Sequence, residues 1–372
     1  MHIFFPVTYF FLNLAFHLEQ HIKSQIYEFY MLKERKKAKK YINPMIIPII
    51  ILLSHINISA QNVWVREHEP AMNLITEERL ASHIGFLTDS LCQGRATGTI
   101  GNMDAAFWIQ RRFEETGMLK FGDSYGKKVW VRKGLLGHNV MGMIPGSHKT
   151  HCERYIIIGA HFDHLGILEG RLYPGADSNA SGVVAMTSIA EMISYMKSDG
   201  RTYGCNMIFV AFDAKEHSMA GSKALWRLIE GGNLKDPVTG ERITKDKIEF
   251  MVNIDQVGST LSPIHSHRKD FIMMLGNETL KPIKRDMINM CNRFYGLNMD
   301  IGLDYYGSEN FTKMFYRLSD QHAFAENGIP AVFFTSGITM NNNKTYDTTA
   351  TLDLEILRKR IYLIYHWIDR MI

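Results

Sequence analysis

The sequence has 372 residues, of which 46% are hydrophobic and 22% are charged, proportions that exclude a disordered or collagen-like chain. The formal net charge is +4, and it comes from a basic run at residues 31–40, because residues 61–372 carry equal numbers of acidic and basic groups. The basic isoelectric point therefore gives no argument for nucleic-acid binding.

The first 60 residues have the pattern of a leader. The basic run "MLKERKKAKK" precedes a short apolar run, "MIIPIIILL" (45–53), and "INISAQ" offers a small-residue cleavage site after Ala60. We therefore predict a signal peptide at residues 31–60 and export to the periplasm or the cell exterior. Residues 1–30 are apolar without a basic flank, and we interpret them as an upstream start. The alternative is a membrane anchor formed by the uncleaved leader.

Residues 61–372 predict a single domain in which strands and helices alternate. Helical patterns occupy 79–90, 103–117, 181–200, 221–232 and 352–372. Short apolar runs that end in glycine or polar residues predict buried strands at 138–146, 154–163, 206–213, 250–258 and 329–337. The alternation indicates an α/β fold with a mixed, mainly parallel twisted sheet and helices on both faces. Active sites in such folds lie beyond the carboxyl ends of the strands.

Four cysteines lie far apart and show no metal-binding spacing: Cys92, Cys152, Cys205 and Cys291. An oxidising compartment would allow two of them to pair, but we favour buried free thiols.

The predicted strand ends carry a histidine and several carboxylates. His161 and Asp163 end one strand, Asp177 leads into a helix, Glu216 follows a third strand, and Asp255 lies in a fourth. A histidine together with carboxylates suits zinc. Asp163 is placed to accept a hydrogen bond from the His161 ring and to fix its tautomer. Singly, such an acid could equally cap a helix or turn; the full set predicts a metal site.

Five motifs carry a family resemblance: "GAHFDHLG", "PGADSNASGVVA", "FDAKEHSMAGS", "VNIDQVG" and "SDQHAFAENGIPAVFFTSG". In order and spacing they resemble the M28 family of zinc exopeptidases, which includes bacterial leucyl aminopeptidases and, as relatives, the glutaminyl cyclases. The resemblance covers roughly residues 80–370 and implies a three-layer sandwich that acts on peptide amino termini. It also implies that His161, Asp177 and Asp255 hold one zinc, and that Asp177 and Glu216 hold a second.

The chain departs from the family pattern at the second metal. The family has its general base, a glutamate, directly before the ligand that corresponds to Glu216, and here that residue is Lys215. Asn343 stands where a zinc-binding histidine is expected. In "SDQH", Gln321 takes the place of a family histidine and His322 follows it. Ser178 replaces a frequent aspartate.

The two main departures are linked by charge. Two zinc ions would balance three ligand carboxylates and a base carboxylate, whereas one zinc ion and the Lys215 ammonium would balance the three carboxylates alone. Unbalanced buried charge costs several kcal/mol, so we expect Lys215 to lie between Asp177 and Glu216 in place of the second zinc. The alternative is that Lys215 points to solvent.

Three hypotheses follow. The first is an exported pseudo-enzyme that holds one zinc, or none, and binds peptide amino termini; contact with a membrane would come through the leader if it is uncleaved. The second is a working zinc aminopeptidase in which His322 or His217 supplies the missing group. The third is an interaction protein with a vestigial pocket.

Overall fold

The computed structural model describes residues 67–147, 153–262 and 267–372, so the predicted signal peptide and its cleavage site lie outside the described residues. The chain divides into two units, residues 1–67 and 68–372, and the second contains every element described below. Within the described ranges, no helix is both long and apolar enough to cross a membrane.

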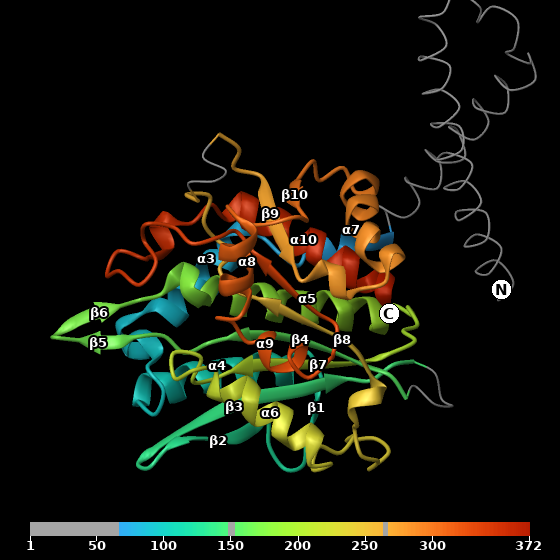
Figure 1. Cartoon of the computed structure of the whole chain (residues 1–372), viewed down its shortest axis with the longest axis horizontal. Helices are drawn as coiled ribbons and strands as arrows, with labels where there is room; N and C mark the ends of the chain where they lie inside the picture. Colours follow the sequence, from blue (N-terminus) through green and yellow to red (C-terminus); the bar gives the residue numbers. More distant parts are fainter. Residues whose placement is uncertain (1–66, 148–152, 263–266) are drawn as a thin grey trace, which may run out of the picture. The chain divides into compact units, whose positions relative to one another are not determined.

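A nine-stranded mixed sheet forms the centre of the second unit. Its strands run in the order β1-β3-β7-β4-β8-β11-β9-β10, with β2 paired to β3. Strands β7, β4, β8 and β11 are parallel to one another, and β3 and β9 flank them in antiparallel pairs. The strands are β1 (Leu119–Lys120), β2 (Gly126–Arg132), β3 (Leu135–Ile144), β4 (Tyr155–His161), β7 (Asn206–Phe212), β8 (Ile248–Ile254), β9 (Phe271–Leu275), β10 (Asp300–Gly302) and β11 (Ala331–Thr335). A separate hairpin pairs β5 (Gly166–Leu168) with β6 (Arg171–Tyr173) and projects from the domain (Figure 1).

Helices cover both faces of the sheet (Figure 1). One face is packed by α3 (Glu77–Thr88), α4 (Ile100–Glu115), α5 (Gly182–Ser198), α7 (Pro282–Phe294) and α10 (Leu354–Met371). The other face is packed by α6 (Ala220–Glu230) and α9 (His322–Ala325), with α8 (Glu309–Tyr316) beside them. Short 3-10 turns lie at Ser90–Arg95, Lys245–Lys247, Asn277–Thr279 and Thr349–Thr351, and an irregular turn at Ala176–Ser181 leads into α5.

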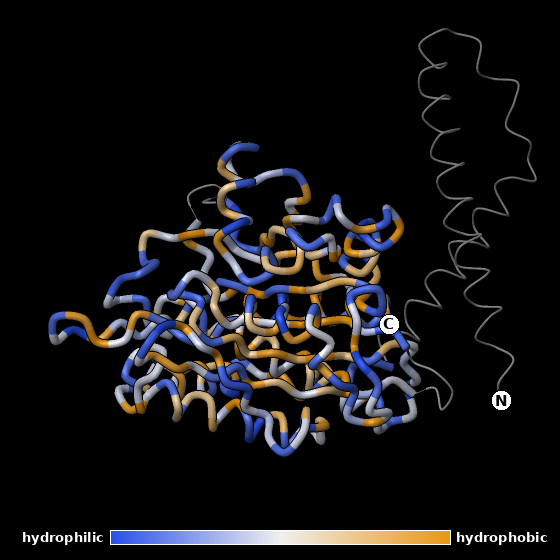
Figure 2. The backbone as a smooth tube through the Cα atoms, turned by 60° about the horizontal axis from the view of Figure 1, so that its bottom comes forward, coloured by the Kyte–Doolittle hydropathy of each residue, from blue (hydrophilic) through white to orange (hydrophobic). Residues whose placement is uncertain are grey.

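Strand β7 shows why the central strands read as continuous apolar runs. Met207, Phe209 and Ala211 pack into the core under α5, while the alternate residues Ile208 and Phe212 pack into the core under α6. Both faces of the strand are therefore buried, and successive side chains serve opposite layers. Figure 2 shows the corresponding apolar colouring along the strands inside the domain. The predicted α/β sandwich is confirmed.

Side-chain caps begin several helices where the sequence has Thr or Asp. The Thr99 hydroxyl accepts a hydrogen bond from the Asn102 N–H at the start of α4, and the Asp353 carboxylate accepts one from the Ile356 N–H at the start of α10. Such caps satisfy N–H groups that have no partner within the helix. They explain why these helices begin close to the predicted positions.

All five predicted strands and all five predicted helices are present, with boundaries that differ by a few residues. The sequence analysis missed β1, β2, β9, β10, the β5–β6 hairpin and helices α7, α8 and α9. Several of these are short, and β2 has a mixed, partly exposed pattern. Cys92 and Cys291 are buried free thiols, as favoured; Cys205 is also buried, and Cys152 lies outside the described residues.

Candidate functional site

The predicted site residues come together at the carboxyl ends of three adjacent strands. His161 is the last residue of β4, Lys215 and Glu216 follow β7, and Asp255 directly follows β8. These strands are neighbours in the sheet, so their ends share one edge. Asp177 lies in the turn before α5.

The His161 ring is buried and bridges two acidic residues. Its Nε2 lies 3.3 Å from Asp255 Oδ1, and its Nδ1 lies 3.0 Å from the backbone carbonyl oxygen of Asp163. Burial by itself lowers the pKa of His161, but the negative charge of Asp255 and the hydrogen bonds to Asp163 and Asp255 together raise it to about 10. The Asp163 carboxylate is 3.6 Å from Nδ1. The predicted hydrogen bond from the His161 ring to Asp163 is therefore present, and its acceptor is the backbone carbonyl of Asp163.

The Asp163 carboxylate instead holds the loop that follows β7. Its two oxygens accept hydrogen bonds from the backbone N–H groups of Lys215 (3.0 Å) and Glu216 (3.1 Å). This loop contains three non-glycine residues with left-handed backbone, Ala214, Ser218 and Met219, whose φ angles are 60°, 57° and 59°. Such conformations are uncommon outside glycine and gather at functional sites. The carboxylate of Asp163 thus fixes where Lys215 and Glu216 stand.

Lys215 pairs with Glu216, one of the two acids between which the charge argument placed it. Its Nζ lies 3.2 Å from Glu216 Oε1, and the exposed fractions of the two side chains are 18% and 22%. Burial opposes the charged form, but the carboxylates of Asp255 and Glu216 together raise the pKa of Lys215 above its ordinary value. The predicted salt bridge to Glu216 is confirmed. The ammonium therefore stays protonated and faces the acids of the site.

Asp177 is buried and half satisfied. Its Oδ1 accepts hydrogen bonds from the N–H groups of Gly258 (2.8 Å) and Ser259 (3.2 Å), whereas Oδ2 is buried without a hydrogen-bond partner among the described residues. Burial, followed by the nearby charge of Asp347, raises the pKa of Asp177 to about 7. An unpartnered carboxylate oxygen of this kind is an open acceptor.

The next residues are those at which the chain departs from the family pattern or could replace a missing group. His322 Nε2 is 3.6 Å from Glu326 in the same helix, so its recorded partner is a surface carboxylate. Asn343 is exposed and has a left-handed φ of 58°. The buried Gln321 accepts a hydrogen bond from Asn253 Nδ2 at 2.8 Å and thereby has a structural role. His217, the weaker substitute, directly follows Glu216 and is half-buried.

The sequence analysis missed several supporting residues. Asp347 accepts hydrogen bonds from the N–H groups of Asp177 and Ser178, and the Ser319 hydroxyl donates to Asp255 Oδ2 at 2.6 Å. The buried Arg95 donates to four backbone carbonyls, those of Leu87, Phe162, Pro174 and Gly175, and so ties together the loops around the site. Apart from Leu87, eight residues from Arg95, these partners are more than 60 residues apart in the chain, and single-sequence spacing carries no signal for them.

A further imidazole, that of His164, is buried at the site. Neither ring nitrogen has a hydrogen-bond partner among the described residues. Burial, followed by the charges of Arg95 and His161, lowers the pKa of His164 well below its ordinary value. The ring is therefore neutral. The motif "GAHFDHLG" contains His164, but the sequence analysis predicted no role for it.

The donor chemistry partly fits zinc. Two ligands about 2.0–2.2 Å from a tetrahedral zinc lie roughly 3.3 Å apart, which is the distance between His161 Nε2 and Asp255 Oδ1. Over the described ranges, however, no three His, Cys, Asp or Glu side chains are gathered as a metal-binding group. The His161–Asp255 pair is therefore the part of the site whose spacing fits a zinc ion, and we assign no chemical step to a metal.

Comparison with known proteins gives a consistent family. The model of peptidase family M28 matches residues 139–368. The alkaline phosphatase isozyme conversion protein of Escherichia coli is 27% identical over 181 residues, covering 42% of this chain and 49% of that protein. The human BOS complex subunit NCLN is 33% identical over 113 residues, 30% of this chain and 19% of that protein. The chain thus spans half or less of the length of the curated relatives it matches.

Solved structures share the fold. The LapA aminopeptidase of Legionella pneumophila has a TM-score of 0.60 at 18% identity, covering 81% of this chain and 73% of that one. The zinc aminopeptidase BSAP of Bacillus subtilis has a TM-score of 0.59 at 11% identity, covering 80% and 95%. The glutaminyl cyclase of Porphyromonas gingivalis has a TM-score of 0.56 at 15% identity, covering 80% and 99%.

Proposed function

Because the chain belongs to peptidase family M28, we propose that it is an exported member of the family that binds peptide amino termini and in which two-zinc hydrolysis is impaired. The observation that carries the proposal is the Lys215 ammonium, 3.2 Å from Glu216, at the position where the resemblance places a general base. An ammonium has no lone pair with which to accept a proton from water.

The electrostatics support loss of the base. The carboxylates of Asp255 and Glu216 raise the pKa of Lys215 despite its burial, so deprotonation at neutral pH is disfavoured. Loss of a general base commonly lowers a rate by roughly 10²–10⁴-fold. The exposed Asn343 supplies no charge or imidazole for a second metal. Both features favour a binding role over fast turnover.

The acidic strand ends provide the attraction for an amino terminus. Asp255 and Glu216 both face the Lys215 ammonium, and Asp177 keeps one carboxylate oxygen open. An incoming ammonium group could therefore form a charge-assisted hydrogen bond, which is stronger than a neutral one. Peptide amino termini are the corresponding ligand class.

The test is calorimetric titration of the mature protein with a tripeptide and with its N-acetylated form. We expect the free tripeptide to bind at least about tenfold more tightly, since acetylation removes the charge that the site pairs. Glu216→Gln should weaken binding of the free tripeptide, whereas Glu230→Gln, at the exposed end of α6, should not. Equal affinity for the two tripeptides would contradict the proposed ligand.

We also propose at most one zinc per chain, held by His161, Asp177 and Asp255, with none as the alternative. Metal analysis of the purified protein would measure this directly. Two tightly bound zinc ions would refute the one-metal proposal and return attention to His322 as a ligand.

Export rests on the leader pattern. Cleavage after Ala60 should give a mature protein that begins at Gln61, and amino-terminal sequencing of exported protein measures this. Retention of residues 45–58 would instead support the membrane-anchor alternative.

A working aminopeptidase remains the second candidate, and the tetrahedral spacing of His161 Nε2 and Asp255 Oδ1 is the observation that favours it. An assay with aminoacyl anilides separates the two. Turnover at ordinary enzyme rates, about 1–10³ s⁻¹, would support the enzyme, and a rate far below this range would support the binding protein. Absence of both turnover and amino-terminal binding would favour the third alternative, an interaction protein with a vestigial pocket.

A further inference from the structure

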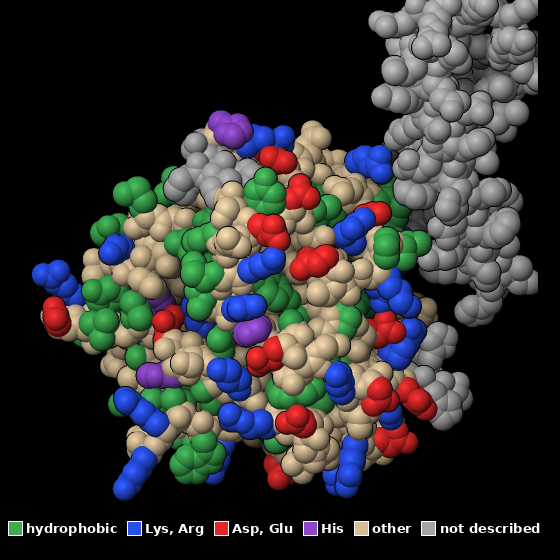
Figure 3. Space-filling view, viewed as in Figure 1, with side chains coloured by type: hydrophobic (Ala, Val, Ile, Leu, Met, Phe, Trp, Pro, Cys, Tyr) green, Lys and Arg blue, Asp and Glu red, His purple; other side chains and the backbone are tan. Residues whose placement is uncertain are grey.

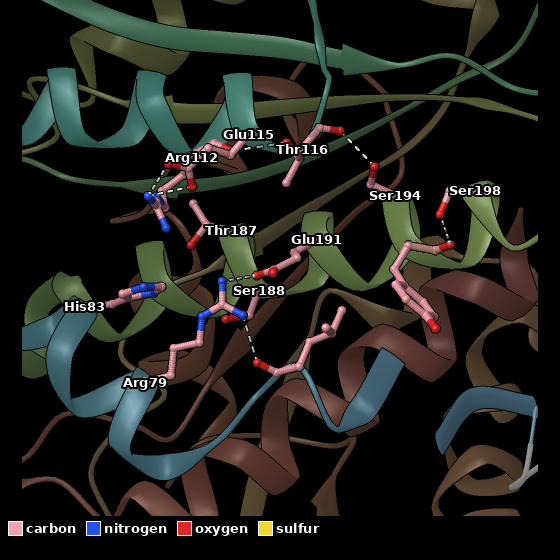
Figure 4. A pocket seen from close by; sticks show the side chains of 12 residues that line it. Arg79, His83, Arg112, Glu115, Thr116, Thr187, Ser188, Glu191, Ser194 and Ser198 are labelled. Atoms are coloured by element: carbon pink, nitrogen blue, oxygen red, sulfur yellow. Dashed lines mark hydrogen bonds and ion pairs between the residues drawn. The ribbon is translucent and has the colours of Figure 1, made fainter. Parts of the chain in front are cut away.

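A second concave site lies in the helix layer, separate from the strand ends. A cleft of about 230 Å³ is bounded by α3, α4 and α5. Figure 4 shows side chains of α3 and α4 at one end, with α5 forming the floor. The cleft shares no lining residue with the candidate site. It is smaller than the roughly 300–1,000 Å³ pockets that enclose drug-sized ligands, so its size suits a small metabolite.

Arg112 on α4 lines the cleft, and one of its N–H groups is unpaired within the described part of the chain. Its NH2 group donates to Glu115 Oε1 at 2.6 Å, and its guanidinium lies 5.7 Å from the centre of the Trp108 ring. Its Nε–H, in contrast, is buried without a hydrogen-bond partner among the described residues. The Arg112 side chain as a whole lines the cleft and is 21% exposed, so its guanidinium can meet an acceptor bound there.

His83 on α3 faces the same end of the cleft. Burial, followed by the positive charges of Arg79 and Arg112, lowers the pKa of His83 to about 4. The imidazole is therefore neutral at pH 7 and offers one N–H donor. Its ring packs edge-on against Trp108 at 5.2 Å, which restrains its orientation. Burial is the main reason that the ring stays neutral, and the two arginines that add to it can also attract an anion.

The remaining charges limit how much negative charge a ligand can carry. Arg79 donates to the Leu74 carbonyl at 2.9 Å and pairs with Glu191 at 2.8 Å, so Glu191 and Glu115 balance the two arginines. Pairs that are partly exposed, as these are, contribute little and exchange partners readily. Ser188 on the floor adds a hydroxyl group. One anionic group, rather than several, matches this arrangement.

We propose that this cleft binds a small ligand through one carboxylate or phosphate group, which accepts hydrogen bonds from the Arg112 guanidinium and the His83 ring. A carboxylate would come from a small organic acid or free amino acid, and a phosphate from inorganic phosphate or a small ester. A guanidinium group binds carboxylate and phosphate oxygens with the same geometry.

The experiment is a titration of the ¹⁵N-labelled mature protein with acetate, glycine and inorganic phosphate, followed at the Arg112 Nε–H resonance. We expect a saturable shift with at least one probe. Acetate or glycine without phosphate would identify the carboxylate source, and phosphate alone the phosphate source. The absence of a saturable shift with all three probes at millimolar concentration would overturn the proposal.

Matched variants test the assignment. Arg112→Gln should weaken binding by about tenfold or more, because it removes a charge-assisted hydrogen bond. Arg111→Gln removes the same charge from the adjacent position of α4, where the side chain is 77% exposed, and should leave affinity unchanged. For these variants the shift is followed at backbone amides that line the cleft. Equal weakening by the two variants would show non-specific attraction and overturn the site.

A third variant keeps the charges and removes the space. Ser188→Leu places a larger side chain on the cleft floor and should abolish the saturable shift even if Arg112→Gln proves unstable. Thermal unfolding of each variant identifies loss of folding as the cause of any loss of binding. A folded Ser188→Leu protein that binds as well as the wild type would exclude the cleft as the binding place.

Discussion

The strand-end site and the helix-layer cleft both combine basic and acidic side chains, but they differ in burial. At the strand ends His161 and Asp255 are fully or almost fully buried, and each charge depends on a fixed partner. In the cleft the Arg79–Glu191 pair is about one-third exposed. Buried charges cannot lose a partner without a large cost, whereas water replaces the partner of an exposed charge. The first region is therefore locked by its charges and the second can rearrange around a ligand.

The described surface is consistent with this division. Figure 3 shows basic and acidic side chains interspersed over the visible face of the domain, with apolar side chains between them. Because residues 61–372 have no net charge, ligand binding depends on local groups of side chains. Examples are Lys215 with its carboxylates and Arg112 with His83. Experiments can test this contrast between the two regions.

The largest expected effect comes from restoring the family residues at the locked site. Lys215→Glu with Asn343→His should raise zinc content and aminoacyl-anilide turnover together, with a rate increase of about 10²–10⁴-fold from the restored base. Each single change should do little, because Lys215→Glu alone adds negative charge without a metal. Metal analysis and the anilide assay measure both quantities.

The control for this pair is the adjacent residue. Asn342 accepts a hydrogen bond from Gln256 Nε2 at 2.9 Å. The control variant, Lys215→Glu with Asn342→His, places the new histidine one residue away from the expected ligand position. If the control variant is active and the Asn343 variant is not, the ligand position is residue 342 and not residue 343. A fast wild-type enzyme would remove the basis of the prediction.

The second prediction concerns the stability of the locked site. Asp255→Asn removes the charge that faces both His161 and Lys215, so we expect a loss of about 3–5 kcal/mol in the free energy of unfolding. Urea denaturation measures the change. Asp286→Asn, an exposed acid on α7, should change it by less than about 0.5 kcal/mol. A similar, small effect of both variants would mean that the site charges are solvated.

The matching change in the cleft should be much weaker. Glu191→Gln breaks the ion pair with Arg79, and we expect a loss of at most about 1 kcal/mol because the pair is partly exposed. The same denaturation assay applies. A loss as large as that of Asp255→Asn would show that the cleft is locked too, and the contrast between the regions would fail.

A further expected effect is a pH dependence from His83. Its pKa is about 4 in the folded chain and near 6.5 when unfolded, so folding favours the neutral ring. The resulting stability is present above pH 6.5 and is lost as the pH falls from 6.5 towards 4. His83→Gln should therefore flatten this part of the stability curve, whereas His267→Gln, at an exposed position, should not. Parallel curves for wild type and His83→Gln would contradict the lowered pKa.

Much of the fold could be predicted because local pattern and tertiary environment agree. Strands β4, β7 and β8 are buried on both faces, so each reads as an apolar run that ends at the sheet edge. Edge strand β2 is partly exposed, and its mixed sequence gives no comparable signal. Short strands such as β10 depend on a neighbour for their hydrogen bonds, which a local pattern cannot supply.

The sequence by itself determined which residues stand at the strand ends, because strand length and alternation place His161, Lys215 and Asp255 at one edge. It also determined, through charge balance, that Lys215 would face a carboxylate. Tertiary structure alone decided that the Asp163 carboxylate binds backbone N–H groups while its carbonyl contacts His161. Tertiary structure also decided the contact of Asp347 with the Asp177 N–H, across 170 residues, and the meeting of three helices at Arg112. The physical reason is that hydrogen bonds select partners by position in space, and chain folding sets that position over separations which composition and periodicity do not encode.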